Sequence, residues 1–187
     1  MVTLAGLWLP ILISAVLVFI ASTLVHMVLK YHASDYKKLP NEDAVRAAIS
    51  SGKPEARQYV IPYPSSPQDM KSPEMQQKYK EGPVGVLTLK VPGPMAMGSS
   101  MGQWFVFNLA VSLAVAYLAY GTIRWGADFR HVFRVVGTVA FLAYGAGTLP
   151  AAIWMGKPWS IAIKDLIDAL IYGLVTAATF AWLWPKA

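Results

Sequence analysis

Residues 4–29 read LAGLWLPILISAVLVFIASTLVHMVL, a run of 26 residues without a charged side chain. A helix of about 20 residues crosses about 30 Å of membrane hydrocarbon, because each residue rises about 1.5 Å. No basic segment precedes the run, which is too long for a signal peptide and ends at Lys30 without a clear cleavage site of small residues. It therefore predicts a permanent membrane-spanning helix.

Three more apolar segments follow, at residues 103–123, 133–155 and 161–184. Tryptophan supports these limits, because an indole ring prefers the level of the lipid headgroups, where its N–H stays in contact with water. All seven tryptophans lie near the end of a segment: Trp8, Trp104, Trp125, Trp154, Trp159, Trp182 and Trp184. The sequence thus predicts four membrane spans.

The composition points to the same class of protein. Hydrophobic residues make up 56% of the 187 residues and charged residues only 14%, whereas soluble domains carry about 25% charged residues. The net charge of +6 comes mainly from the hydrophilic connections, and no basic face alternates with aromatic residues as a nucleic-acid site requires. Cysteine is absent, which excludes disulfides, thiolate metal sites and a cysteine nucleophile.

Residues 30–102 form the only long hydrophilic part of the chain. Residues 40–49 predict a short helix that Gly52 stops, and Ser72 is a predicted N-cap for a second helix that ends at Gly82.

Two short strands are predicted in the same region, at residues 58–61 and 84–91, and residues 98–100 predict a flexible hinge where the chain re-enters the membrane. The predicted fold class is therefore an all-α membrane protein, a four-transmembrane-helix bundle with a small α/β extramembrane insertion between helices 1 and 2.

Small residues recur at every fourth position of the last segment, and they let helices approach closely where lipid supplies no hydrophobic force. The repeat consists of Ala169, Gly173, Ala177 and Ala181, and the third segment repeats the spacing with Ala143 and Gly147. We favour packing within the bundle over a dimerisation face. Pro150 predicts a kink or an end in the third segment.

Basic residues give conflicting indications of the orientation in the membrane. Seven lie near span ends on the side of the long loop and four on the opposite side, which favours a cytoplasmic loop, yet the short connections and the tail alone give two against four. No basic side chain precedes the first span, whereas Lys30, Lys37 and Lys38 follow it. We therefore expect the N-terminus outside and the loop in the cytoplasm.

Polar residues occur at similar depth in all four segments, one or two helical turns from the loop side. They are His26, Asn108, Thr148 and Asp168, with Lys30, Lys164 and Asp165 just beyond them. Ionisable groups at this depth usually face inward, towards a partner. The predicted intramembrane polar cluster consists of His26, Asn108, Asp165 and Asp168. We hypothesise that His26 and Asp168 hold a proton or a small cation.

The start of the fourth segment also allows a simpler interpretation, which we favour. The uncharged residues 169–184 cover only about 24 Å, so the helix must begin earlier and Asp168 lies near the hydrocarbon edge. Lys164 and the aspartates then lie in the first, water-exposed turns of a helix, where acidic side chains interact favourably with the helix dipole. Lys164 can also pair with Asp168, four residues later. His26 can bond a backbone carbonyl, and Asn108 can join two helices.

Neither a metal nor a cofactor is predicted. His26 and His32 are six residues apart and do not share a helix face well, and His131 belongs to the opposite surface. The chain has no G-x-S-x-G, Walker A or dinucleotide-binding motif. Candidate contacts with lipid headgroups are Arg124, Arg130 and Arg134, which also fit an interfacial anchor cluster.

Several stretches resemble a group of uncharacterised small bacterial inner-membrane proteins with four spans. They are PEMQQKYKEGPVGVLTLKVPGP at 73–94, VFRVVGTVAFLAYGAGT at 132–148, IWMGKPWS at 153–160 and KDLIDALIYGLVTAATFAWLWP at 164–185. The resemblance covers nearly the whole chain. It implies a location and no activity, and it carries over no functional residue.

The leading functional expectation is a non-enzymatic structural or accessory membrane protein, a subunit or partner in a membrane complex. Residues 30–102 are its largest surface for contacting another protein or a second copy of the chain. The alternative is a small transporter or channel for a proton or small cation, which predicts a water-lined cavity that reaches Asp168. An intramembrane enzyme acting on lipid ranks third, because only the pair Asp165 and Asp168 offers catalytic groups.

Overall fold

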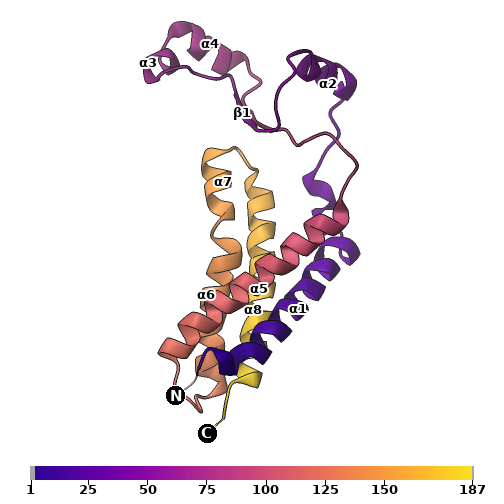
Figure 1. Cartoon of the computed structure of the whole chain (residues 1–187). Coiled ribbons are helices and arrows are strands. Elements are labelled where there is room, and N and C mark those ends of the chain that lie inside the picture. The colour runs from indigo at the N-terminus through magenta and orange to yellow at the C-terminus, as the bar shows by residue number, and fades with distance from the viewer. Residues whose placement is uncertain (1–2, 187) are drawn as a thin grey trace. The chain divides into compact units, whose positions relative to one another are not determined.

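Four helices are long and apolar enough to cross a membrane in the computed structural model, which describes residues 3–186. They span Ala5–Val28, Met97–Thr122, Phe129–Trp154 and Trp159–Leu183. Figure 1 shows them running side by side, with both termini at the same end of the bundle. The predicted fold class is confirmed: the chain is an all-α integral membrane protein with a small α/β insertion after its first span.

The first span changes its helical geometry near the loop side. The 3₁₀ turn η1 (Ala5–Leu7) leads into α1 (Trp8–Thr23), which continues as the π-helical turn η2 (Leu24–Val28). The helix stops at Lys30, whose φ of 52° puts it in the left-handed region that non-glycine residues rarely adopt. A second 3₁₀ turn, η3 (Tyr31–Asp35), then takes the chain in a new direction.

The second span, α5 (Met97–Thr122), begins six residues before its predicted start. The predicted hinge at residues 98–100 is wrong, because these residues are helical. Glycine and serine lower the helix propensity of a segment, but they do not stop a helix whose following residues favour it.

The third span consists of two helices, α6 (Phe129–Gly145) and α7 (Thr148–Trp154). Asp128 caps α6, since its carboxylate accepts a hydrogen bond from the backbone N–H of His131 at 3.0 Å. The break between α6 and α7 confirms the effect predicted for Pro150, whose ring crowds the carbonyl four residues earlier. The fourth span, α8 (Trp159–Leu183), begins before its charged residues, as its length requires.

The bundle is a ring in which α8 packs against α6 and α1, and α5 packs against α1 and α6. The closest approach is between α6 and α8, where a Cβ on Gly173 would lie 3.1 Å from the backbone N of Phe141 and 3.3 Å from the carbonyl O of Gly137. The small residues of α8 are therefore used inside the bundle. Their partners on α6 are Gly137 and Gly145, not the predicted Gly147, which has open space beside it because it lies past the end of α6.

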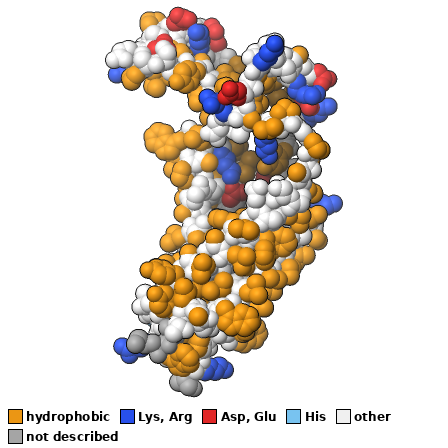
Figure 2. Space-filling model, in the orientation of Figure 1, with side chains coloured by type: hydrophobic (Ala, Val, Ile, Leu, Met, Phe, Trp, Pro, Cys, Tyr) orange, Lys and Arg blue, Asp and Glu red, His pale blue; other side chains and the backbone are white. Residues whose placement is uncertain are grey.

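The half of the bundle that holds the termini has an apolar interior. Its largest fully buried hydrophobic side chains are Leu7, Val115, Val132, Val136 and Phe180. Outside, Figure 2 shows hydrophobic side chains over most of the visible surface of the bundle, with charged side chains towards its two ends. A hydrophobic exterior of this kind contacts the lipid bilayer.

The insertion belongs to a separate compact unit of residues 37–95 and 153–157. Its elements are α2 (Glu42–Ser51), β1 (Gln58–Ile61), α3 (Pro67–Met70), α4 (Pro73–Glu81) and β2 (Gly85–Thr88). The predicted strands exist and pair antiparallel, with Gln58 opposite Thr88 and Ile61 opposite Gly85. The predicted cap of α4 is confirmed too, because Ser72 accepts a hydrogen bond from the backbone N–H of Met75 at 3.1 Å.

We expect Gly173→Ala to destabilise the protein by about 1–3 kcal/mol, because the added methyl group would press on backbone atoms that cannot move aside. The matched control is Gly121→Ala in α5, where nothing lies within 4 Å of the new Cβ, so that the better helix propensity of alanine adds up to about 1 kcal/mol. Thermal unfolding in detergent measures both. Equal stabilities of the two variants would contradict the close contact of α6 and α8.

Candidate functional site

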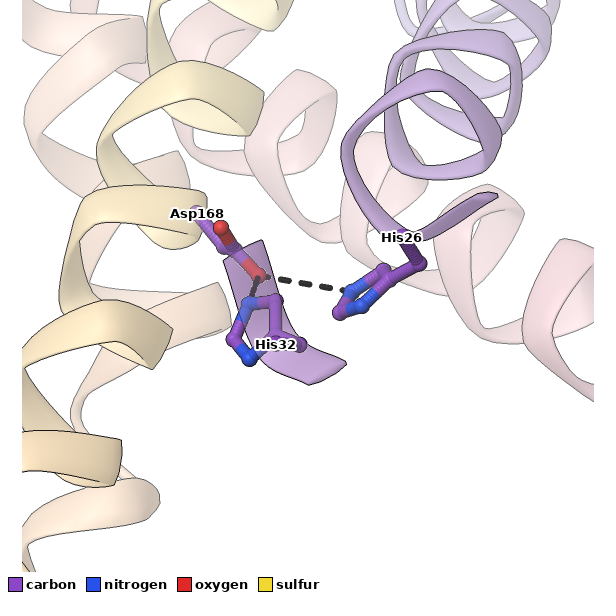
Figure 3. Close-up of side chains that lie close together, drawn as sticks. All are labelled: His26, His32 and Asp168. Atoms are coloured by element: carbon purple, nitrogen blue, oxygen red, sulfur yellow. Dashed lines mark hydrogen bonds and ion pairs between the residues drawn. The ribbon is translucent and has the colours of Figure 1, made fainter. Parts of the chain in front are cut away.

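Two histidines converge on one buried carboxylate at the loop-side end of the bundle. Asp168 on α8 is only 5% exposed, and its Oδ2 lies 2.9 Å from Nε2 of His32 and 3.3 Å from Nε2 of His26. One ligand atom from each of the three residues lies within 4.8 Å of the other two. Figure 3 shows both imidazole rings turned towards the carboxylate.

The irregular end of the first span brings the histidines together. His26 lies in the π-helical turn η2, a geometry often found at functional sites, and His32 lies in η3, beyond the left-handed Lys30. Their ring centroids are 4.6 Å apart, at an interplanar angle of 31°. The six-residue spacing of His26 and His32 disfavours a shared metal site only if one continuous helix connects them. The helix breaks at Lys30, so this reason does not apply.

His32 has a carboxylate on each side of its ring. Its Nδ1 lies 2.6 Å from Oδ2 of Asp35, and its Nε2 faces Asp168. A 3₁₀ turn has three residues per turn, so residues 32 and 35 lie on the same face of η3. A neutral imidazole has one donor and one acceptor, whereas an ionised carboxylate only accepts. While both carboxylates are ionised, both contacts are favourable when His32 carries two protons, or when Nε2 and Asp168 share another cation.

Lys164 fixes η3 against α8. Its ammonium group donates hydrogen bonds to the carbonyl O of Tyr31 at 2.8 Å, to Oγ of Ser34 at 2.9 Å and to Oδ1 of Asp35. All three of its donors are used. The hydrogen bond from Lys164 lowers the pKa of the Asp35 carboxyl below its ordinary value, so that Asp35 stays ionised beside His32. The predicted pair of Lys164 with Asp168 is wrong, because η3 presents a nearer anion.

The other predicted cluster residues lie around this centre. Oδ2 of Asp165 accepts a hydrogen bond from Oγ1 of Thr148 at 2.7 Å, which ties α8 to α7. Asn108 is fully buried inside the bundle, and neither of its amide atoms has a hydrogen-bond partner among the described residues. The hydrogen bond expected to join two helices through Asn108 is therefore absent among residues 3–186. The structure brings His26 and Asp168 together, and Asn108 belongs to a deeper layer.

The three arginines predicted to contact headgroups lie at the opposite end of the bundle. Arg124, Arg130 and Arg134 are all exposed, and the carbonyl of Arg124 accepts a hydrogen bond from the indole N–H of Trp184 at 3.0 Å. Their contacts with lipid headgroups stay a prediction.

Sequence reasoning missed His32 and Asp35 as site residues. The available signal was the spacing His32-x-x-Asp35 directly after the apolar run, where polar residues resume. Spacing alone could not reveal the left-handed turn that directs this motif towards Asp168. His26, His32 and Asp168 each offer one possible ligand atom, and these two imidazole nitrogens and one carboxylate oxygen converge on a common point. Such a point attracts a cation.

No known protein family matches the chain, and neither a curated protein nor a solved structure matches it. The resemblance to small bacterial inner-membrane proteins therefore stays a prediction.

We expect Lys164→Met to loosen η3, because three hydrogen bonds from a charged donor are lost. A hydrogen bond to a charged group contributes about 1.5–3 kcal/mol, so amide hydrogen exchange in residues 31–35 should accelerate at least about tenfold. The control is Lys38→Met, an exposed lysine outside the site. Unchanged exchange in the Lys164 variant would show that η3 does not depend on this lysine.

Proposed function

We propose that this integral membrane protein binds a divalent transition-metal ion of the zinc class through His26, His32 and Asp168. The observation that carries the proposal is the convergence of one ligand atom from each of the three residues within 4.8 Å of one another. Imidazole nitrogen and carboxylate oxygen are ordinary zinc ligands, at about 2.0–2.2 Å from the metal. Ligand atoms of a tetrahedral site with such bonds lie roughly 3.3 Å apart. The contacts of 2.9 and 3.3 Å to Asp168 are close to this spacing.

The surroundings of His32 support a metal over a shared proton. A histidine that ligates a metal usually donates its other ring N–H to a carboxylate, which fixes the tautomer and the ring orientation. Asp35 lies within hydrogen-bond distance of Nδ1 of His32 and can accept its N–H, and Lys164 in turn donates a hydrogen bond to Asp35. With a metal at Nε2, each nitrogen of His32 has a suitable partner. One divalent ion also neutralises the buried Asp168 without a second proton on either imidazole.

The set of three protein ligands leaves a fourth tetrahedral position free. The hydroxyl of Tyr172 lies 3.4 Å from Nε2 of His26, at the edge of the site. The side chain of His26 is 48% exposed, so the site is accessible to small ligands from its edge. An open fourth position permits exchange of the ion or binding of a further group.

The metal-binding role agrees with the accessory protein that the sequence favours. The structure describes every residue of 37–95, and Met75 is the only buried one among them. Large apolar side chains of this region are exposed: Leu39, Val60, Ile61, Tyr63, Met70, Val84 and Val91. An insertion with so little core of its own gains stability by contacting a partner or a second copy of the chain. We further propose, from the sequence resemblance and the distribution of basic residues, that the protein lies in a bacterial inner membrane with the N-terminus outside and the insertion in the cytoplasm.

We expect the purified protein in detergent to bind one Co²⁺ per chain, with the visible absorption of tetrahedral cobalt, and Zn²⁺ to displace it. The purification tag must contain no histidine, and the absence of cysteine from the chain removes thiols as competitors. His32→Gln and Asp168→Asn should each weaken binding by at least about 100-fold, and Asp35→Asn by about 10–100-fold.

The matched control is His131→Gln, which lies in α6 at the opposite end of the bundle and should bind as the wild type does. Failure of the wild type to bind Co²⁺ would overturn the proposal. An affinity of His32→Gln equal to that of the wild type would overturn the assignment of the ligands.

A second candidate function, transport of the metal ion, is favoured by the polar side chains of Tyr172, Thr176 and Asn108 inside the bundle. If the protein transports the ion, proteoliposomes that contain a zinc-sensitive dye should take up Zn²⁺ when they carry the wild type or His131→Gln, and not when they carry Asp168→Asn. Uptake that is the same with Asp168→Asn would show that the ion does not pass through the site, and the accessory role would then stand alone.

A further inference from the structure

A groove of about 350 Å³ runs along the outside of the bundle, between α6 and α8. Gly137 on α6 and Gly173 on α8 line it, and neither has a side chain to fill the space between the helices. The other walls are mostly large and apolar: Phe133 and Phe141 on α6, and Leu170 and Leu174 on α8. Leu170 is 49% exposed and Leu174 45%, so the groove opens towards the lipid.

Arg134 is the only charged side chain among the residues that line the groove. It follows the first residue of α6 by five residues, or about 8 Å along the helix axis, which places it near the edge of the hydrocarbon layer. From there the groove continues to Phe141, about 10 Å closer to the membrane centre. The hydroxyl of Thr138, also in the groove, donates a hydrogen bond to the carbonyl O of Arg134 at 2.8 Å. The groove therefore has one cationic end and an apolar remainder.

The guanidinium of Arg134 has no carboxylate partner within residues 3–186, the part of the chain that the structure describes. Asp128 is the only acidic residue between Glu81 and Asp165, and its carboxylate caps the start of α6. A charge at the hydrocarbon edge is costly without a partner, and a long side chain can extend its charged end towards the headgroups. A guanidinium there matches the geometry of a phosphate, which accepts two parallel hydrogen bonds from it.

We propose that the groove binds one anionic phospholipid, with its phosphate on Arg134 and an acyl chain between α6 and α8 as far as Phe141. The site lies at the opposite end of the bundle from the proposed metal site and does not depend on it. It also distinguishes Arg134 from Arg124 and Arg130, which do not line the groove.

Charge complementarity favours a lipid over a second copy of the chain as the occupant. A second copy inserted in the same direction would bring only Asp128, among its acidic side chains, to the level of Arg134. That carboxylate already accepts a hydrogen bond from the backbone N–H of His131. The phosphate of a lipid reaches Arg134 without displacing any contact of the protein.

Native mass spectrometry of the detergent-purified protein tests the site, because it counts the lipids bound to each chain. The protein is titrated with dioleoyl phosphatidylglycerol and, separately, with dioleoyl phosphatidylcholine, which has the same acyl chains and no net charge. We expect one phosphatidylglycerol per chain to bind at least about fivefold more tightly, since one basic side chain near the membrane surface contributes about this factor. Equal affinities for the two lipids would overturn the proposal.

Variants separate the two ends of the groove. Arg134→Gln should abolish the preference for phosphatidylglycerol and Arg134→Lys should keep most of it, whereas the matched control Arg130→Gln, one turn away and outside the groove, should bind as the wild type does. Leu170→Trp should weaken binding with Arg134 intact, because the indole fills the deep end. Elution as a single species verifies that each variant folds. An equal loss in Arg130→Gln would show diffuse attraction instead of a site, and no effect of Leu170→Trp would overturn the path of the acyl chain.

Photo-crosslinking locates the lipid without any substitution. In proteoliposomes, phosphatidylglycerol with a diazirine in its acyl chain should label residues 137–141 and 170–174, as peptide mass spectrometry reads them. An excess of glycerol 3-phosphate should not reduce this labelling, because a free headgroup gains no apolar contacts. Labelling confined to other surfaces would overturn the site, and competition by glycerol 3-phosphate would overturn the role of the groove. A dimer that takes no label on α6 and α8 would assign the groove to a second copy.

Discussion

A carboxylate buried at the end of a membrane-spanning helix needs positive charge beside it, and the loop-side half of this bundle is arranged around that need. Asp168 is almost completely buried, and lipid supplies neither water nor counter-ions at this depth. Its neighbours are two imidazoles. An imidazole becomes cationic on protonation and is a common metal ligand when neutral. Without them Asp168 would either take up a proton or carry an uncompensated charge into the membrane.

A second charged pair holds this arrangement in place. Lys164 and Asp35 neutralise each other, and the lysine also bonds two further groups of η3, so that His32 keeps a fixed ring orientation. Lys30 contributes through its backbone, since the left-handed conformation ends the helix where the chain must turn towards Asp168. A non-glycine residue in this conformation costs of order 1–2 kcal/mol, which the contacts of η3 offset.

The sequence predicts the parts of the structure that depend on regular periodicity. Four apolar runs long enough to span lipid, the cap at Ser72 and the break near Pro150 follow from local rules, and the structure agrees with them. The candidate site was predicted only in part. His26 and Asp168 could be matched by depth, but His32 reaches them through one left-handed residue, and nothing in the residue type of Lys30 indicates that conformation.

The sequence also could not predict which residues of neighbouring helices face each other. The small residues of α8 predict a close contact with another helix. Because α6 contains several small residues, only the packed structure shows that Gly137 and Gly145 are the ones that face α8. The same limit applied to the interior. Asn108 and Ser112 are ordinary polar residues in an apolar run, and only the packed structure shows that both are fully buried and that Ser112 accepts a hydrogen bond from Ser14 of α1.

The turn η3 contains the proposed ligand His32 and leads into the insertion at its end, since Asp35 is followed directly by Tyr36 and the second compact unit. A molecule that pulls on or reorders the insertion acts on the same short segment that orients His32. If the proposed ion binds and the insertion changes conformation, the two events would be thermodynamically linked, and such linkage is reciprocal. The connection between them would be the five residues of η3.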